Sequence, residues 1–197
     1  MTICLRSWTR LGLLFGLALW LTSCGGGRLV YAQNAVGLGY SPDQNLERID
    51  TAEIAVAQTT IDLAAFSLTD QAIVDALVDR AVHGVVIRIY LDRGELQAEC
   101  RGDATCARIP LRALIGLKGV QIRAKHSKVL MHLKSYCVDG SVVRDGSANF
   151  SEQGERNQDN SASFTTGTDT VGAFQAKFTA MWFRPDNLTV AQALETP

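Results

Sequence analysis

One group of polar residues at fixed spacing constrains this chain more than any other feature. His132 and Lys134 are separated by one residue, Asp139 follows after four more, and Gly146-Ser147-Ala148-Asn149 follows after another six. Alternate residues of a strand point to the same face. A strand over residues 132–138 would therefore project His132 and Lys134 together.

The residues after this strand predict an anion site. Asp139-Gly140 favours a two-residue hairpin turn, because both residues readily take positive φ. The returning chain would bring the Ser147 hydroxyl, nearby backbone N–H groups and the Asn149 amide to the same end of the hairpin as Lys134. These groups, placed beside an imidazole, suit a phosphoryl group whose charge must be stabilised as a bond to phosphorus breaks.

The pattern HxK(x)4D(x)6GSxN resembles the signature of the phospholipase D superfamily, the HKD motif, and every motif position is present. The resemblance continues upstream through residues 40–42, 61–69 and 84–93. These stretches look like the small single-motif bacterial members, which include endonucleases. The resemblance implies one HKD motif per chain in an α/β/α sandwich, with a mixed sheet flanked by helices, and no metal or other cofactor.

The resemblance also implies a role for each motif residue. His132 would attack phosphorus to form a phosphohistidine, and Lys134 and Asn149 would hold the nonbridging oxygens with support from Ser147. Asp139 belongs to the motif, and at the strand end it is expected to anchor the loop. We assign a carboxylate that fixes the tautomer of His132 to Asp159, with Glu155 as the second candidate.

The mechanism requires a second histidine, which protonates the leaving alcohol and later activates water. His83 and His126 are the only other histidines, and they lack the surroundings of the motif. His126 and Lys128 begin a second HxK, but Leu133 stands where Asp should follow and Val143 where Asn should. We therefore expect a homodimer that completes the active site with a second His132.

Three classes of function fit these residues. The first is a phospholipase D type hydrolase acting on phospholipid headgroups, and the second is a nonspecific nuclease. The third is a noncatalytic binding protein on the same scaffold. Residues 104–138 contain no Asp or Glu, so they could form an electropositive approach for anionic headgroups or nucleic acid, or simply a solvated basic face. Their basic residues are Arg108, Arg112, Lys118, Arg123, Lys125, Lys128 and Lys134.

The N-terminus has the layout of an export signal. Arg6 and Arg10 precede an apolar run from Leu11 to Leu21, which is shorter than an ordinary membrane-spanning helix. The run ends in Leu-Thr-Ser-Cys, which resembles a bacterial lipobox. Removing this segment deletes two arginines and no acid, so the rest of the chain is more acidic than its overall net charge of -1. General coating of nucleic acid is therefore not expected.

The lipobox resemblance implies a lipoprotein signal peptide over residues 1–23, lipidation of Cys24 and a flexible linker over 24–35. The chain would then be a bacterial cell envelope lipoprotein, periplasm-facing or at the outer membrane, tethered to the membrane through Cys24. Cleavage after Ala32, which would release a secreted enzyme, is the alternative.

In an exported protein the remaining cysteines would meet an oxidising compartment, where disulfides form. Cys100 and Cys106 lie in one polar stretch and could close a small disulfide. Metal binding is the alternative, but no nearby His or further Cys completes a four-ligand site. Cys137 is expected to be a buried small side chain.

Strand and helix patterns alternate along a single catalytic domain over residues 36–186, followed by a C-terminal tail over 187–197. This alternation predicts a sheet that is parallel early and antiparallel at the motif hairpin. Phe174, Phe178 and Trp182 recur every four residues, which indicates core packing of a closing helix. Strands are expected over 36–40, 61–66, 85–91, 120–124, 132–138 and 161–165, and helices over 46–58, 70–82, 110–117 and 171–183.

Overall fold

The computed structural model describes residues 36–101, 103 and 105–195. The expected signal peptide over 1–23, the lipidation site Cys24 and the linker over 24–35 lie outside the described residues. Among the described helices, none is both long enough and apolar enough to cross a membrane.

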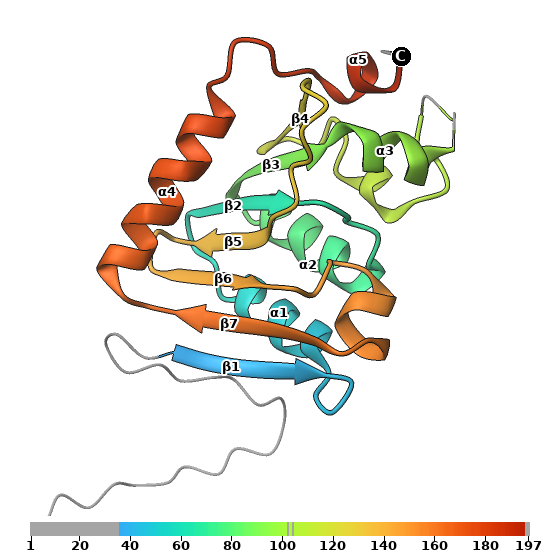
Figure 1. The fold of residues 1–197 in the computed structure, drawn as a ribbon. Helices are drawn as coiled ribbons and strands as arrows, with labels where there is room; N and C mark the ends of the chain where they lie inside the picture. Colours follow the sequence, from blue (N-terminus) through green and yellow to red (C-terminus); the bar gives the residue numbers. More distant parts are fainter. Residues whose placement is uncertain (1–35, 102, 104, 196–197) are drawn as a thin grey trace, which may run out of the picture.

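A seven-stranded mixed sheet forms the centre of the fold, with strand order β1-β7-β6-β5-β2-β3-β4 (Figure 1). Strands β2, β3 and β4 pair in parallel, and the remaining pairs are antiparallel. The mixed sheet predicted from the sequence is confirmed. The strands are β1 (Val36–Ser41), β2 (Thr60–Ala65), β3 (Val86–Asp92), β4 (Val120–Lys125), β5 (Lys134–Val138), β6 (Val142–Gly146) and β7 (Asn160–Thr165).

Helices cover both faces of the sheet, as an α/β/α sandwich requires. On one face α1 (Leu46–Ala55) and α2 (Gln71–Val82) share the main apolar core with Leu63 and Ile89 of the sheet. On the other face α4 (Thr168–Trp182) packs over Ala64 and Tyr90. Neighbouring residues of a strand point to opposite faces, so β2 and β3 contribute to both cores.

Local sequence explains where the first helices begin. The Asn45 side chain accepts a hydrogen bond from the backbone N–H of Arg48, and Asp70 does the same for Ile73. Such caps satisfy a backbone donor that the first helical turn leaves unpaired. The expected aromatic core is also present: Phe174, Phe178 and Trp182 stack along α4 with ring centroids 5.8 and 5.7 Å apart.

The structure differs from the predicted elements in several places. The strand expected over 132–138 begins at Lys134, so His132 lies before it, and a π-helix at Gln153–Asn157 was not expected. Helix α3 (Arg93–Cys100) directly follows β3, where no helix was expected, and the predicted helix over 110–117 is only a 3-10 turn at Pro110–Ala113. Part of the expected tail over 187–197 instead belongs to the fold. Leu188 pairs with Ala124 of β4, and α5 (Val190–Glu195) buries Ala193 in the main core.

Candidate active site

The motif lies along the β5–β6 hairpin. Lys134 begins β5, at the end of that strand which lies beside the carboxyl end of β2 (Figure 1), and Asp139 lies at the turn. His132 precedes β5, and its ring lies 4.6 Å from that of Phe66 in an edge-on contact. The Lys134 ammonium lies 4.8 Å from the centroid of the same Phe66 ring. The structure thus gathers His132 and Lys134 around Phe66, which sequence reasoning did not single out.

The Lys134 side chain of the motif is buried. The residue is only 5% exposed, and its ammonium donates a hydrogen bond to the backbone carbonyl of His132 at 2.9 Å. Burial lowers the pKa of Lys134, while the nearby Glu95 carboxylate acts in the opposite direction. A buried ammonium and an exposed imidazole that contact the same Phe66 ring offer a cation and a nucleophile that suit a phosphoryl group.

The Asp139 side chain makes structural hydrogen bonds in this protein. Its carboxylate accepts hydrogen bonds from the backbone N–H groups of Gln58, Thr59 and Thr60, at 2.8, 2.8 and 2.9 Å. Burial would raise the pKa of Asp139, but these bonds outweigh burial and hold the pKa below its usual range. The carboxylate therefore fastens the motif hairpin to the loop between α1 and β2, which is the anchoring role expected for it.

The Gly-Ser-Ala-Asn segment is held against β7. The Ser147 hydroxyl donates to Asn160 Oδ1 at 2.9 Å and accepts from the backbone N–H of Ser161 at 3.0 Å. A Cβ added at Gly146 would lie 2.1 Å from the Ser161 carbonyl oxygen, so only glycine fits there. In this structure the Ser147 hydroxyl ties two strands together, and phosphate contact by this hydroxyl stays a proposal.

Asn149 is held by its backbone and has a buried side-chain oxygen. Its buried Oδ1 has no hydrogen-bond partner among the described residues. Its backbone is clamped by the π-helix at Gln153–Asn157, since a Cβ on Gly154 would lie 2.4 Å from the Asn149 carbonyl oxygen. An unsatisfied buried polar atom is costly, and such atoms recur at functional sites.

A fully buried arginine joins the two halves of the motif. One terminal nitrogen of Arg144 donates to the backbone carbonyls of Lys134 at 2.6 Å and Ala148 at 3.1 Å. Its other terminal nitrogen contacts Glu155 and Asp50, each at 3.1 Å. Arg144 thus connects the start of β5 to the Gly-Ser-Ala-Asn segment from beneath.

The carboxyl groups that contact Arg144 are buried with it. Tyr136 donates to Asp50 at 2.8 Å, and Asp50, Arg144 and Glu155 are each 0% exposed. Burial, together with the nearby Asp50 carboxylate, raises the pKa of Glu155 to about 10. The Arg144 guanidinium acts in the opposite direction on this pKa, because it favours the charged form of Glu155.

Neither candidate carboxylate meets His132 in this structure. Asp159 is exposed, and among the described residues no hydrogen bond joins it to the imidazole. Glu155, the second candidate, is engaged with Arg144 in the core instead. The assignment of Asp159 as the orienting carboxylate stays a proposal.

The buried network was missed at the sequence level, although α1 carries a signal for it. Leu46, Asp50 and Ile54 recur every four residues, so Asp50 occupies the apolar face of a helix and is buried with its neighbours. A carboxylate there needs a buried partner. Arg144, the only charged residue of β6 on the core face, is that partner.

The remaining expected residues have clear positions. Cys100 and Cys106 are joined in a disulfide, and burial raises the pKa of the free thiol of Cys137 to about 11. The basic residues of 104–138 do not form one solvated face, because Lys125 and Lys134 are buried. Exposed His126 lies 3.8 Å from Asp186.

Comparison with known proteins agrees with this geometry. Residues 51–182 match the family described as cardiolipin synthase, PLD-like domain. Mitochondrial cardiolipin hydrolase of Xenopus laevis is 29% identical over 133 residues, which cover 68% of this chain and 59% of that protein. The enzyme of the same name from Chlamydomonas reinhardtii is 25% identical over 126 residues, covering 64% of this chain and 52% of that protein. The chain thus spans somewhat over half the length of these relatives.

Two solved structures share the fold. Nuc from Salmonella typhimurium, a phospholipase D family member, superposes with a TM-score of 0.66 and 24% identity, covering 80% of this chain and 99% of that chain. NucT from Helicobacter pylori gives a TM-score of 0.65 and 18% identity, covering 76% of this chain and 96% of that one. The sheet order, the placement of the motif and the family match together show that this chain belongs to the phospholipase D superfamily.

Proposed function

We propose that this chain is a phosphodiesterase that hydrolyses phospholipid headgroups through a covalent phosphohistidine. The observation that supports the chemistry is the gathering of His132 and Lys134 around Phe66 at the mouth of the motif. The relatives named as cardiolipin hydrolases support a lipid substrate.

The loop before the motif favours lipid over nucleic acid. Val129 and Leu130 are 72% and 61% exposed, although the next residue, Met131, is buried against α4. The backbone N–H of Met131 also donates to Asp92 at 2.8 Å. A fixed loop therefore presents two apolar side chains immediately before His132. Such side chains suit a lipid surface better than a hydrated polyanion.

In the proposed reaction a ring nitrogen of His132 attacks phosphorus while the bond to the leaving alcohol oxygen breaks. A second histidine gives that oxygen its proton. The same histidine then takes a proton from water, whose oxygen attacks phosphorus and breaks the phosphorus–nitrogen bond. Phosphatidate is released and His132 is regenerated. Lys134 and Asn149 would stabilise the charge on the nonbridging oxygens, and Asp159 is proposed to orient the imidazole.

The second histidine is proposed to come from another copy of the chain. His83 interacts with Asp79 at the end of α2, and His126 lies beside Asp186, so both stand in other surroundings. A homodimer would place two copies of His132 across a two-fold axis. We further propose that Cys24 is lipidated and holds the dimer at the cell envelope, close to its substrate.

A purified protein and its His132→Ala variant, assayed on lipid vesicles and on single- and double-stranded DNA with EDTA, test the proposal. We expect the wild type to cleave lipid in EDTA and the variant to be inactive. Cleavage of DNA alone would replace the lipid proposal with the alternative, a nonspecific endonuclease of the same chemistry. Binding without turnover of any of these would indicate a noncatalytic protein.

A further inference from the structure

A cleft of about 510 Å³ lies along α3, on the far side of the loop that follows β2. We call it the α3 cleft. No motif residue lines it, and nothing in the proposed reaction uses it. Its lining combines two carboxyl groups with two guanidinium groups: Thr69, Glu95, Glu99, Arg101, Arg108 and Ile109 are its principal residues.

Several contacts connect the α3 cleft to the candidate phosphate site. Phe66 contacts His132, and the hydroxyl of the next residue, Ser67, donates to Glu99 Oε1 at 2.5 Å. Glu95 acts electrostatically on Lys134. The backbone N–H of Thr69 donates at 2.9 Å to the carbonyl of Phe150, the residue after Asn149. Residues that line the α3 cleft therefore lie close to the motif in the fold.

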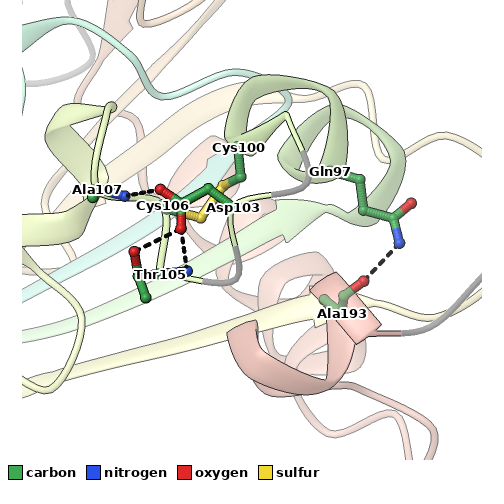
Figure 2. The surroundings of a disulfide bond; sticks show 7 residues. All are labelled: Gln97, Cys100, Asp103, Thr105, Cys106, Ala107 and Ala193. Carbon is green, nitrogen blue, oxygen red and sulfur yellow. Dashed lines mark hydrogen bonds between the residues drawn. A yellow bond between two sulfur atoms is a disulfide. The ribbon is translucent and has the colours of Figure 1, made fainter.

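The two arginines of the cleft form no salt bridge with another described residue, although Arg108 interacts electrostatically with Asp103. Arg101 and Arg108 are exposed, and neither side chain forms a hydrogen bond or ion pair with another described residue. The carboxylate nearest in sequence, Asp103, is occupied by Thr105 and by the backbone N–H of Ala107 (Figure 2). Guanidinium groups bind phosphate in a bidentate manner, so two exposed guanidinium groups that line one cleft suit a phosphate.

A disulfide and a hydrogen bond lie close to these arginines in the sequence. The disulfide shown in Figure 2 joins Cys100, the residue before Arg101, to Cys106, two residues before Arg108. The Gln97 amide donates to the Ala193 carbonyl at 2.7 Å, which fastens α3 to α5. Both links restrain the segments that carry the arginines, which lowers the entropy cost of binding a ligand.

From the motif outward the order of charges is a cation at Lys134, carboxyl groups at Glu95 and Glu99, and cations again at Arg101 and Arg108. Phosphates suit the two cationic ends, and hydroxyl groups suit the carboxyl groups between them. We propose that the α3 cleft binds the second phosphate of a lipid whose glycerol headgroup bridges two phosphodiesters. This proposal rests on the proposed function, and it assigns to Arg101 and Arg108 the selection of two-phosphate over one-phosphate lipids.

The test compares two lipids with the same glycerol headgroup, cardiolipin with two phosphates and phosphatidylglycerol with one. For an Arg101→Ala/Arg108→Ala variant of the full chain, we expect the ratio of kcat/KM on cardiolipin to that on phosphatidylglycerol to fall by about tenfold or more. Arg112→Ala, at an exposed arginine outside the cleft, should keep the wild-type ratio. An unchanged ratio in the double variant would overturn the proposal.

A binding measurement separates this proposal from the proposed function. On the His132→Ala background, calorimetry with water-soluble short-chain forms of both lipids needs no turnover. Removing the two arginines should weaken binding of the two-phosphate form by about tenfold relative to the one-phosphate form. Equal weakening of both, or preferential loss of a dinucleotide, would overturn the lipid assignment of the α3 cleft. A wild type that cleaves neither lipid would overturn the proposed function separately.

Discussion

The motif and the α3 cleft are neighbouring regions that differ in the burial and pairing of their charged side chains. Beneath the motif Asp50, Arg144 and Glu155 are fully buried and contact one another. In the α3 cleft the guanidinium groups of Arg101 and Arg108 are exposed and have no ion pair among the described residues. The comparison indicates that the first region uses charge to fix backbone geometry, whereas the second keeps charge available for a ligand.

Arg144→Met should give the largest effect, because it leaves Asp50 without its cation and frees the Lys134 and Ala148 carbonyls. Breaking a buried ion pair from one side costs about 3–5 kcal/mol of the free energy of unfolding. Urea denaturation measures the loss. Arg112→Met, at an exposed arginine, is the matched control and should differ little from wild type. A loss as small as that of the control would refute the structural role of Arg144.

Gly154→Ala should come next, since its Cβ would displace the backbone of Asn149. We expect kcat to fall by about tenfold or more, a loss of about 1.4 kcal/mol in transition-state stabilisation, with circular dichroism showing a folded protein. The control is Gly172→Ala in α4, where nothing lies within 4 Å of the new Cβ. That change should stabilise the helix by up to about 1 kcal/mol. Full activity in Gly154→Ala would contradict the clamp on Asn149.

Asp139→Asn distinguishes anchoring from chemistry within the motif itself. The change weakens three backbone hydrogen bonds to the α1–β2 loop, so the free energy of unfolding should fall by about 1–3 kcal/mol. The accompanying loss of kcat should be far smaller than in His132→Ala. A stable variant with kcat as low as that of His132→Ala would place Asp139 in the reaction.

The smallest effect concerns pH and Glu99. Burial raises the pKa of Glu99 to about 7. The nearby Glu95 carboxylate also raises this pKa, whereas the hydrogen bond from Ser67 lowers it. Arg101 and Arg108 line the same cleft. A carboxyl with a raised pKa binds protons more tightly in the folded state, so its contribution to stability is lost as pH rises from about 4.5 through 7. Glu99→Gln should therefore flatten the fall in stability between pH 5 and 8, measured by thermal unfolding in low-salt buffers. An unchanged slope would contradict the raised pKa.

The sequence predicts much of the fold because its strands and the first two helices carry strong periodic patterns and caps such as Asp70. It also predicts that His132 and Lys134 lie together; both contact Phe66, although His132 lies just before β5 and not within a strand. Helix α3 was missed because its polar sequence has little apolar pattern, and Asp92 supplies a cap that only the end of β3 positions. The Asp50–Arg144–Glu155 network joins residues about a hundred positions apart, which local patterns do not pair.

The central claim is that His132 is the nucleophile of a phosphodiesterase, and trapping the intermediate tests it most directly. Wild-type protein is mixed with the lipid substrate in EDTA, quenched within one turnover and digested for mass spectrometry. The account predicts a phosphatidyl adduct on the peptide that contains His132, absent from the His132→Ala variant. Turnover by wild type that gives no such adduct, or turnover that survives His132→Ala, would contradict it.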